Sequence, residues 1–162
     1  MQELFSILNE KMKERGEIAE VGIIGDAVMC LVYNARESTK DIDAIFEPTS
    51  IIRKVVKEIA TEKDIPEDWL NDAAKGYLVS GFSKQNVLTL PHLVVWAPEP
   101  RYMLAMKCLS ARWDSTDKDD VIFLLNHLKI AHAKEALRIL EDYYPKKRIP
   151  AKTQFFLEEI LG

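Results

Sequence analysis

The stretch Ile23-Ile24-Gly25-Asp26-Ala27, followed by Asp41-Ile42-Asp43, decides the fold of this chain. Residues 20–24 are predicted to form a short buried strand, and the apolar positions of residues 27–35 fall on one helical stripe. Gly25 therefore marks a turn from a strand into a helix. Residues 41–46 are predicted to form a second strand, with Asp41, Asp43 and Ile45 on one face.

The flanking patterns predict an α/β (α+β) fold. Helical spacing predicts a first helix that ends near Gly16, a helix opened by Pro48, and a short helix through Trp69 and Leu70 after a capping-box pattern at Asp64 and Glu67. Residues 87–90 and 93–96 read as short strands. Further helices are expected at about 101–112, 116–128, 132–142 and 152–161. We expect a small mixed-sheet core over residues 1–97 and a C-terminal helical bundle, residues 98–162, packed on it.

The composition is that of an ordinary globular chain, with 48% apolar and 30% charged residues. The net charge of −4 does not favour nucleic acid in bulk, so a polyanion would need a local basic patch such as Lys146-Lys147-Arg148. A solvated helix end is the simpler interpretation of that triplet. The nearby aromatic residues Tyr143, Tyr144, Phe155 and Phe156 suit helix packing better than base stacking.

The sequence contains neither a signal-peptide pattern nor an apolar stretch that could cross a bilayer. Cys30 and Cys108 lie in apolar helical patterns, and reduced core thiols are favoured over a disulfide. We therefore expect a cytoplasmic protein without a membrane partner.

The aspartate pair suits a metal site. Residues i and i+2 of a strand point the same way, so Asp41 and Asp43 would repel each other unless a cation neutralises them. Mg²⁺ commonly binds through one or two carboxylates plus substrate phosphates, and the helix start after Gly25 could hold phosphate oxygens. The basic Arg36 and Lys40 lie between these two elements. The alternative for Asp41 and Asp43 is a pair of solvated acids near the start of a strand, and the alternative for Gly25 is a tight turn that binds no ligand.

These residues also carry a resemblance to a known family. The pattern Ile24-Gly25-x-Ala27, a helix, and Arg36-x-Ser38-Thr39-Lys40-Asp41-Ile42-Asp43 resembles the nucleotidyltransferase superfamily, which has the DNA polymerase β-like fold. The chain is more closely similar to a bacterial family of short nucleotidyltransferase-like proteins, and distantly similar to the AbiEii-type toxins of toxin–antitoxin systems. The similarity covers nearly the whole chain, including residues 66–72 and 104–107.

The resemblance implies a role for each matching residue. In the superfamily a Gly-Gly or Gly-Ser turn holds the triphosphate and two strand aspartates bind Mg²⁺, which places these roles on Gly25, Asp41 and Asp43. A lysine and a downstream aspartate complete the site in the toxin-like relatives. Lys107 would then offset phosphate charge, and Asp117 would accept the proton of the attacking hydroxyl.

The residues proposed in the helical region have an ordinary alternative. Lys107 can be an exposed helix lysine. Asp117, Asp119 and Asp120 can be first-turn acids that the helix dipole favours by roughly 0.3–1 kcal/mol each. Ser115 or Thr116 would then be the N-cap.

Two departures from the superfamily pattern bear on activity. Asp26 stands where Gly or Ser is expected, and it could repel the phosphates, cap the following helix, or add a metal ligand. The strands at 87–90 and 93–96 carry no third metal-binding carboxylate, for which Glu99 or Asp117 could substitute.

We therefore expect a Mg²⁺-dependent nucleotidyltransferase that moves a nucleoside monophosphate from a triphosphate to a hydroxyl acceptor. The acceptor would be RNA or a protein side chain, and an antitoxin is a candidate partner. The alternatives are an inactive nucleotide- or protein-binding module of the same fold and a metal-dependent phosphohydrolase.

Overall fold

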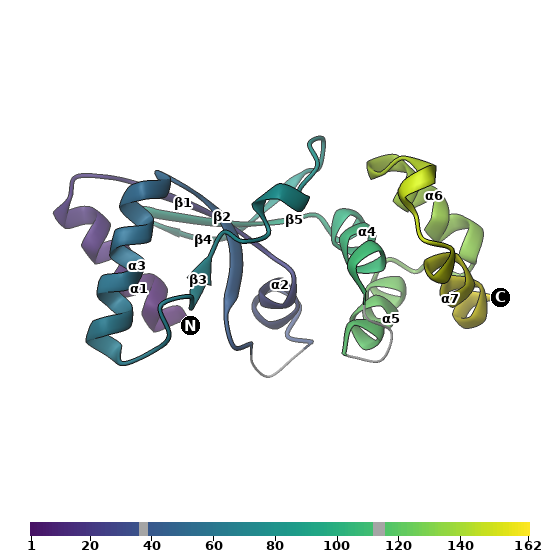
Figure 1. Ribbon diagram of the computed structural model, residues 1–162, viewed down its shortest axis with the longest axis horizontal. Coiled ribbons are helices and arrows are strands. Elements are labelled where there is room, and N and C mark those ends of the chain that lie inside the picture. The colour runs from purple at the N-terminus through teal and green to yellow at the C-terminus, as the bar shows by residue number, and fades with distance from the viewer. Residues whose placement is uncertain (36–38, 112–115) are drawn as a thin grey trace. The chain divides into compact units, whose positions relative to one another are not determined.

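The computed structural model describes residues 1–35, 39–111 and 116–162, and the chain divides into two compact units. Unit 1 consists of Met1–Leu78 and Lys84–Ala97, and unit 2 of Val79–Ser83 and Pro98–Gly162. The predicted mixed α/β class is confirmed, because strands and helices alternate in unit 1 and helices fill most of unit 2 (Figure 1).

Unit 1 is built on a mixed five-stranded sheet with the order β3-β2-β1-β5-β4. The strands are β1 (Ala19–Ile24), β2 (Ile42–Glu47), β3 (Leu70–Asn71), β4 (Lys84–Leu90) and β5 (Leu93–Pro98). The central strand β1 pairs antiparallel with β2 and parallel with β5, while β2 and β3 are parallel. The strand that leads to Gly25 and the strand that carries Asp43 are therefore neighbours in the sheet.

The two faces of the sheet differ in character. One face carries Val21, Ile23, Ala44 and Val95, all fully buried. The helices α1 (Gln2–Glu14) and α3 (Thr49–Lys63) cover this face and lie side by side (Figure 1). Their outer edges are joined by ion pairs between Arg15 and Glu58 at 2.6 Å, Lys11 and Glu62 at 2.7 Å, and Lys63 and Glu3 at 3.1 Å. Such exposed pairs add about 0–1 kcal/mol each, so apolar burial holds these helices in place.

The opposite face follows from the strand register. Glu20 lies beside Glu47 and Val94, Gly22 lies beside Ile45 and Trp96, and Ile24 lies beside Asp43. Because side chains alternate along a strand, these residues share one face. The candidate aspartate Asp43 is on this face, away from α1 and α3.

Unit 2 contains α4 (Pro100–Ser110), α5 (Asp117–His127), α6 (Ala133–Tyr143), the short 3₁₀ turn η2 (Lys146–Arg148) and α7 (Ala151–Leu161). Its core includes the fully buried Tyr102 and Leu140. The α7 residue Thr153 is also fully buried, and its hydroxyl donates to the Cys108 carbonyl at 2.9 Å. Within residues 1–35, 39–111 and 116–162, no helix has the length and apolar character needed to cross a membrane.

Three local predictions were wrong. Leu70 and Asn71 form the edge strand β3 in place of a short helix, because the Ile42 N–H bonds the Trp69 carbonyl at 2.8 Å and aligns this segment beside β2. The helix after Gly25, α2, is short and spans Asp26–Leu31. Asp41 precedes β2, which begins at Ile42.

Candidate functional site

Gly25 forms the turn between β1 and α2. Its φ of 65° and ψ of −136° fall in a region that residues with a side chain rarely adopt, which explains the glycine. It is the N-cap of α2, and its carbonyl accepts the Val28 N–H at 3.1 Å. The backbone at this turn is therefore uncovered by any side chain of its own.

The Asp43 carboxylate lies against this turn. Ile24 and Asp43 are partners in the antiparallel pair of β1 and β2. A Cβ built on Gly25 would have Asp43 Oδ2 as its nearest neighbour, at 3.8 Å. A glycine turn and a half-buried carboxylate thus meet at one end of the β1–β2 pair, as the sequence interpretation requires.

Asp41 lies one residue before β2 and is also half-buried. Burial alternates regularly from residue 41 to residue 46, with Asp41 and Asp43 half-buried and Ile42 and Ala44 buried, as expected for one shared face. The Thr39 hydroxyl donates to the Asp41 carbonyl at 2.9 Å and fixes the backbone entering the strand. Lys40 is exposed, and Arg36 lies outside the described residues.

Asp26 is the first residue of α2 and is half-buried. It does not cap the helix as N-cap, because Gly25 occupies that position and the cap carries no side-chain hydrogen bond. An acid in the first turn is favoured by the helix dipole, by roughly 0.3–1 kcal/mol. This gives Asp26 a structural role beside the glycine turn.

The donor chemistry of this end of the sheet fits Mg²⁺. Asp41 and Asp43 offer carboxylate oxygens, the hard ligands that this ion prefers, and Gly25 leaves room beside Asp43 that a Cβ would fill. Two carboxylates match the usual protein share of a Mg²⁺ site that is completed by substrate phosphates and water. Asp41 and Asp43 are therefore the residues that would hold the ion.

The candidate residues of unit 2 form a buried ion-pair network. Lys107 on α4 is 5% exposed, and its Nζ lies 2.8 Å from Asp120 Oδ2 and 3.1 Å from Asp117 Oδ1, both on α5. Asp120 is buried as well, with a side chain 4% exposed, whereas the side chain of Asp117 is 23% exposed. The alternative of an exposed helix lysine was therefore wrong, and the first-turn acids Asp117 and Asp120 have a specific partner.

Glu99, one substitute considered for the third carboxylate, lies at the start of α4. The Tyr143 hydroxyl donates a hydrogen bond to Glu99 Oε1. Burial, together with this carboxylate, raises the pKa of Tyr143 to about 12. Tyr143 therefore remains a hydrogen-bond donor at neutral pH, and Glu99 has a structural partner within unit 2.

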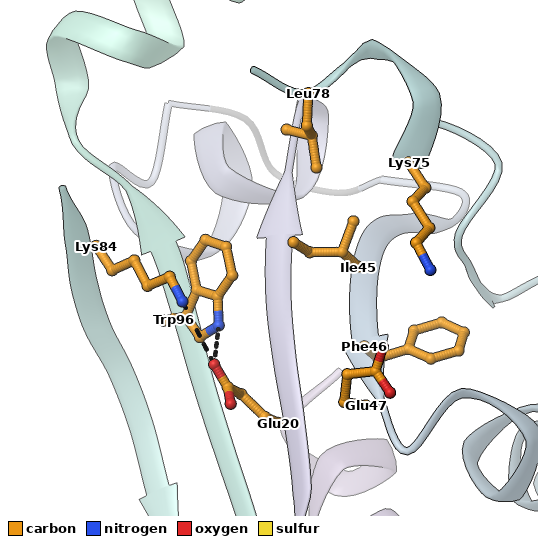
Figure 2. A pocket seen from close by; sticks show the side chains of 8 residues that line it. All are labelled: Glu20, Ile45, Phe46, Glu47, Lys75, Leu78, Lys84 and Trp96. Atoms are coloured by element: carbon orange, nitrogen blue, oxygen red, sulfur yellow. Dashed lines mark hydrogen bonds and ion pairs between the residues drawn. The ribbon is translucent and has the colours of Figure 1, made fainter. Parts of the chain in front are cut away.

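A cavity of about 340 Å³ opens on the same sheet face as Asp43. Figure 2 shows its lining, with Trp96, Glu20 and Lys84 on one side of Ile45 and with Lys75, Phe46 and Glu47 on the other. The Trp96 Nε1–H donates to Glu20 Oε1 at 3.1 Å, and Lys84 Nζ lies 3.5 Å from the same oxygen and 4.4 Å from the Trp96 ring centre. The Trp96 ring lies directly on Gly22, since a Cβ there would come within 2.1 Å of it.

These cavity residues were not identified from the sequence. Asp43 does not line the cavity, but Ile45, two residues further along β2, does. A mixture of apolar and charged groups is typical of small-molecule sites. The only signal in the sequence was the strand alternation, which places Glu20, Ile45 and Trp96 on one face once the register is known.

Comparisons of the chain with protein-family models, with curated proteins and with solved structures find no match.

Proposed function

We propose that this protein is a Mg²⁺-dependent nucleotidyltransferase that transfers a nucleoside monophosphate from a triphosphate to a hydroxyl acceptor. The observation that carries the proposal is the Asp43 carboxylate beside the Gly25 turn, 3.8 Å from the position of the missing Cβ. Turn and acid belong to adjacent strands of unit 1. The sequence resemblance assigns these two residues to the same site independently of this geometry.

The proposal gives each candidate residue of unit 1 a role in binding the substrate. Because Gly25 has no side chain, phosphate oxygens could approach its backbone closely, and N–H groups at the start of α2 would donate to them. Asp41 and Asp43 would hold the Mg²⁺ that binds the triphosphate. When bound, the ion stabilises negative charge on the attacking and leaving oxygens. Lys40 and Arg36 lie in the preceding segment of the sequence and would offset the remaining phosphate charge.

For Lys107 and Asp117 the resemblance supplies roles in phosphate binding and proton acceptance. The ion pairs within unit 2 supply a competing explanation, because two carboxylates neutralise this buried lysine. Stability and activity must therefore be measured together in variants of these residues. A variant that loses activity but keeps its stability would support the catalytic roles.

The alternative is an inactive module of the same fold. Asp26 favours it, since a half-buried carboxylate follows directly after the glycine that would meet the phosphates. Asp26→Gly separates the two. If the substitution creates triphosphate binding that the natural chain lacks, the inactive module is correct. If the natural chain already binds a triphosphate and the substitution changes the affinity less than about fivefold, Asp26 stabilises the start of α2 and does not block the phosphates.

The direct test is calorimetric titration of the protein with ATP, GTP, CTP and UTP in Mg²⁺. Asp43→Asn keeps the shape of the side chain and removes its charge, and Asp68→Asn is a matched control because Asp68 is an exposed acid of unit 1. The proposal expects Mg²⁺-dependent binding of at least one triphosphate, lost in Asp43→Asn and retained in Asp68→Asn. A folded natural chain that binds none of the four would overturn it.

The reducing cytoplasm is the proposed location. Cys30 and Cys108 are free thiols, as expected from the sequence, and such thiols suit a compartment in which disulfides are rare.

A further inference from the structure

Unit 2 carries a groove that the proposed reaction does not use. It lies between α6, η2 and the start of α7 and encloses about 410 Å³. Its lining consists of Lys134, Leu137, Arg138, Glu141, Lys146, Ile149 and Gln154. Leu137 and Ile149 are half-buried and provide apolar surface, while the charged side chains are exposed.

The groove concentrates positive charge in a chain whose net charge is −4. Lys134, Arg138 and Lys146 face a single acid, Glu141, in the lining. None of these three cations forms an ion pair with any residue that the structure describes. Lys134 and Arg138 are also one turn apart on α6, an arrangement of like charges that disfavours an isolated helix. This excess of charge favours an anionic ligand.

The basic surface continues beyond the groove. Lys147 and Arg148 follow Lys146 on η2, and both are exposed. A series of cations of this kind suits a ligand with repeated negative charges better than it suits a single small anion.

An exposed aromatic residue lies beside the groove in the sequence. Phe155 follows the lining residue Gln154 on α7 and is 68% exposed. The other aromatic residues Phe156 and Tyr144 of this region are buried, at 7% and 4% exposure. The expectation that these aromatics all serve helix packing therefore fails for Phe155. An exposed aromatic residue on a helix that lines a groove rich in cations is a combination by which proteins bind single strands.

We propose that this groove binds the sugar–phosphate backbone of a single-stranded nucleic acid, and that Phe155 stacks on a base. Lys134, Arg138 and Lys146 contact successive phosphates, and Lys147 and Arg148 extend the track. A single strand is specified because the bases of a duplex are already stacked on each other and unavailable to Phe155. The proposal rests on side chains of unit 2 and does not require that nucleotidyl transfer takes place.

The test is fluorescence anisotropy with a labelled mixed-sequence RNA of about 12 nucleotides, a length within the range of single-strand sites. The three groove cations alone predict a slope of log K against log salt of about −2, and contacts by Lys147 and Arg148 as well predict about −3.5. Raising the salt from about 50 to about 200 mM should then weaken binding between roughly 20-fold and roughly 130-fold. The same RNA as a duplex, the DNA of the same sequence and inorganic pyrophosphate are measured in parallel.

The diagnostic variant is Lys134→Glu/Arg138→Glu. Its matched control is Lys54→Glu/Lys57→Glu, which makes the same change in net charge with two exposed lysines of α3 in unit 1. We expect the groove variant to bind the single strand at least tenfold more weakly, and the control to bind within about twofold of the natural chain. Phe155→Ala should weaken binding about fivefold or more.

Equal weakening in the groove variant and the control would overturn the proposal, because net charge alone would then explain binding. Tighter binding of the duplex than of the single strand, or an unchanged affinity in Phe155→Ala, would overturn the single-strand assignment. Competition by pyrophosphate at the concentration of RNA phosphate would identify a site for a small anion and would also count against it. DNA binding equal to RNA binding would support recognition through the backbone and bases without the 2′-hydroxyl.

Discussion

Replacing Lys107 by Met should destabilise the protein severely. The substitution keeps an unbranched side chain of similar length but leaves Asp120, with 4% of its side chain exposed, facing a neutral group in place of an ammonium at 2.8 Å. Asp117, at 3.1 Å, loses the same partner. Removing one member of a buried ion pair costs about 3–5 kcal/mol, because the remaining charge stays desolvated and uncompensated. For a chain of this size the loss corresponds to a decrease in Tm of roughly 6–20 °C.

The assay is urea unfolding followed by circular dichroism, with Lys152→Met on α7 as the control for losing an exposed lysine. The control should change the free energy of unfolding by less than about 0.5 kcal/mol. Lys107→Met/Asp120→Asn should recover part of the loss, since the double variant no longer buries the unpaired carboxylate. A loss below about 1 kcal/mol in Lys107→Met, or additive losses in the double variant, would refute the assignment of this network to stability.

Four further results are expected. Gly22→Ala should cost about 1–3 kcal/mol and change the tryptophan emission, because its Cβ would overlap the Trp96 ring at 2.1 Å; an unchanged spectrum and stability would contradict the packing. Gly25→Ala should cost about 1–3 kcal/mol through its φ of 65° alone, since the nearest atom lies at an ordinary 3.8 Å; a neutral result in thermal unfolding would count against this conformation. Burial raises the pKa of the Cys108 thiol from 9.0 to about 12. A thiol reagent at pH 8 should therefore modify the half-buried Cys30 of the native protein first, and should modify Cys108 only after unfolding. The folded state holds the Cys108 proton more tightly than the unfolded state does. The stability that this difference contributes is therefore complete below pH 9.0 and declines as the pH rises toward about 12. Alkaline unfolding curves of the natural chain and of Cys108→Ala would reveal the decline.

Local patterns predicted the elements around the glycine turn. The apolar run before Gly25 became β1, and the alternation after Asp41 became β2, because burial on the sheet imposes a period of two on both segments. The pairing of Ile24 with Asp43 was not available from these patterns, since either strand could have had another neighbour. The strand register therefore shows that the Asp43 carboxylate lies beside the Gly25 turn, which the spacing of the two motifs in the sequence could not show.

The segment at Trp69 shows how tertiary contacts override a local signal. Asp64 and Glu67 fit a helix start, yet the backbone of Trp69 bonds Ile42 and its indole donates to the Val56 carbonyl at 3.1 Å. These contacts come from residues distant in the sequence and align the chain as an edge strand. A capping pattern describes how a helix could begin and carries no information about a competing sheet edge.

Lys107 was the least predictable of the candidate residues. Its apolar neighbours from Met103 to Met106 indicated a buried helix, but a lysine within such a run normally extends to solvent. Burial is tolerated here because Asp117 and Asp120 converge on its ammonium from the next helix. Only the packing of α4 against α5 reveals that convergence.

The two sets of aspartates therefore require different tests. A loss of activity in Asp120→Asn has little diagnostic value, because this substitution removes a buried partner of Lys107 and is expected to lower stability by itself. Asp43 is half-buried at the end of a strand pair, so Asp43→Asn should lower the free energy of unfolding less than Asp120→Asn does.

Measuring unfolding and triphosphate binding on the same preparations of both variants separates the two cases. If Asp43→Asn retains its stability and loses Mg²⁺-dependent binding, the carboxylate beside Gly25 acts on the ligand. If it loses stability and binding in parallel, as Asp120→Asn should, the carboxylate serves the fold and the proposed site in unit 1 is wrong.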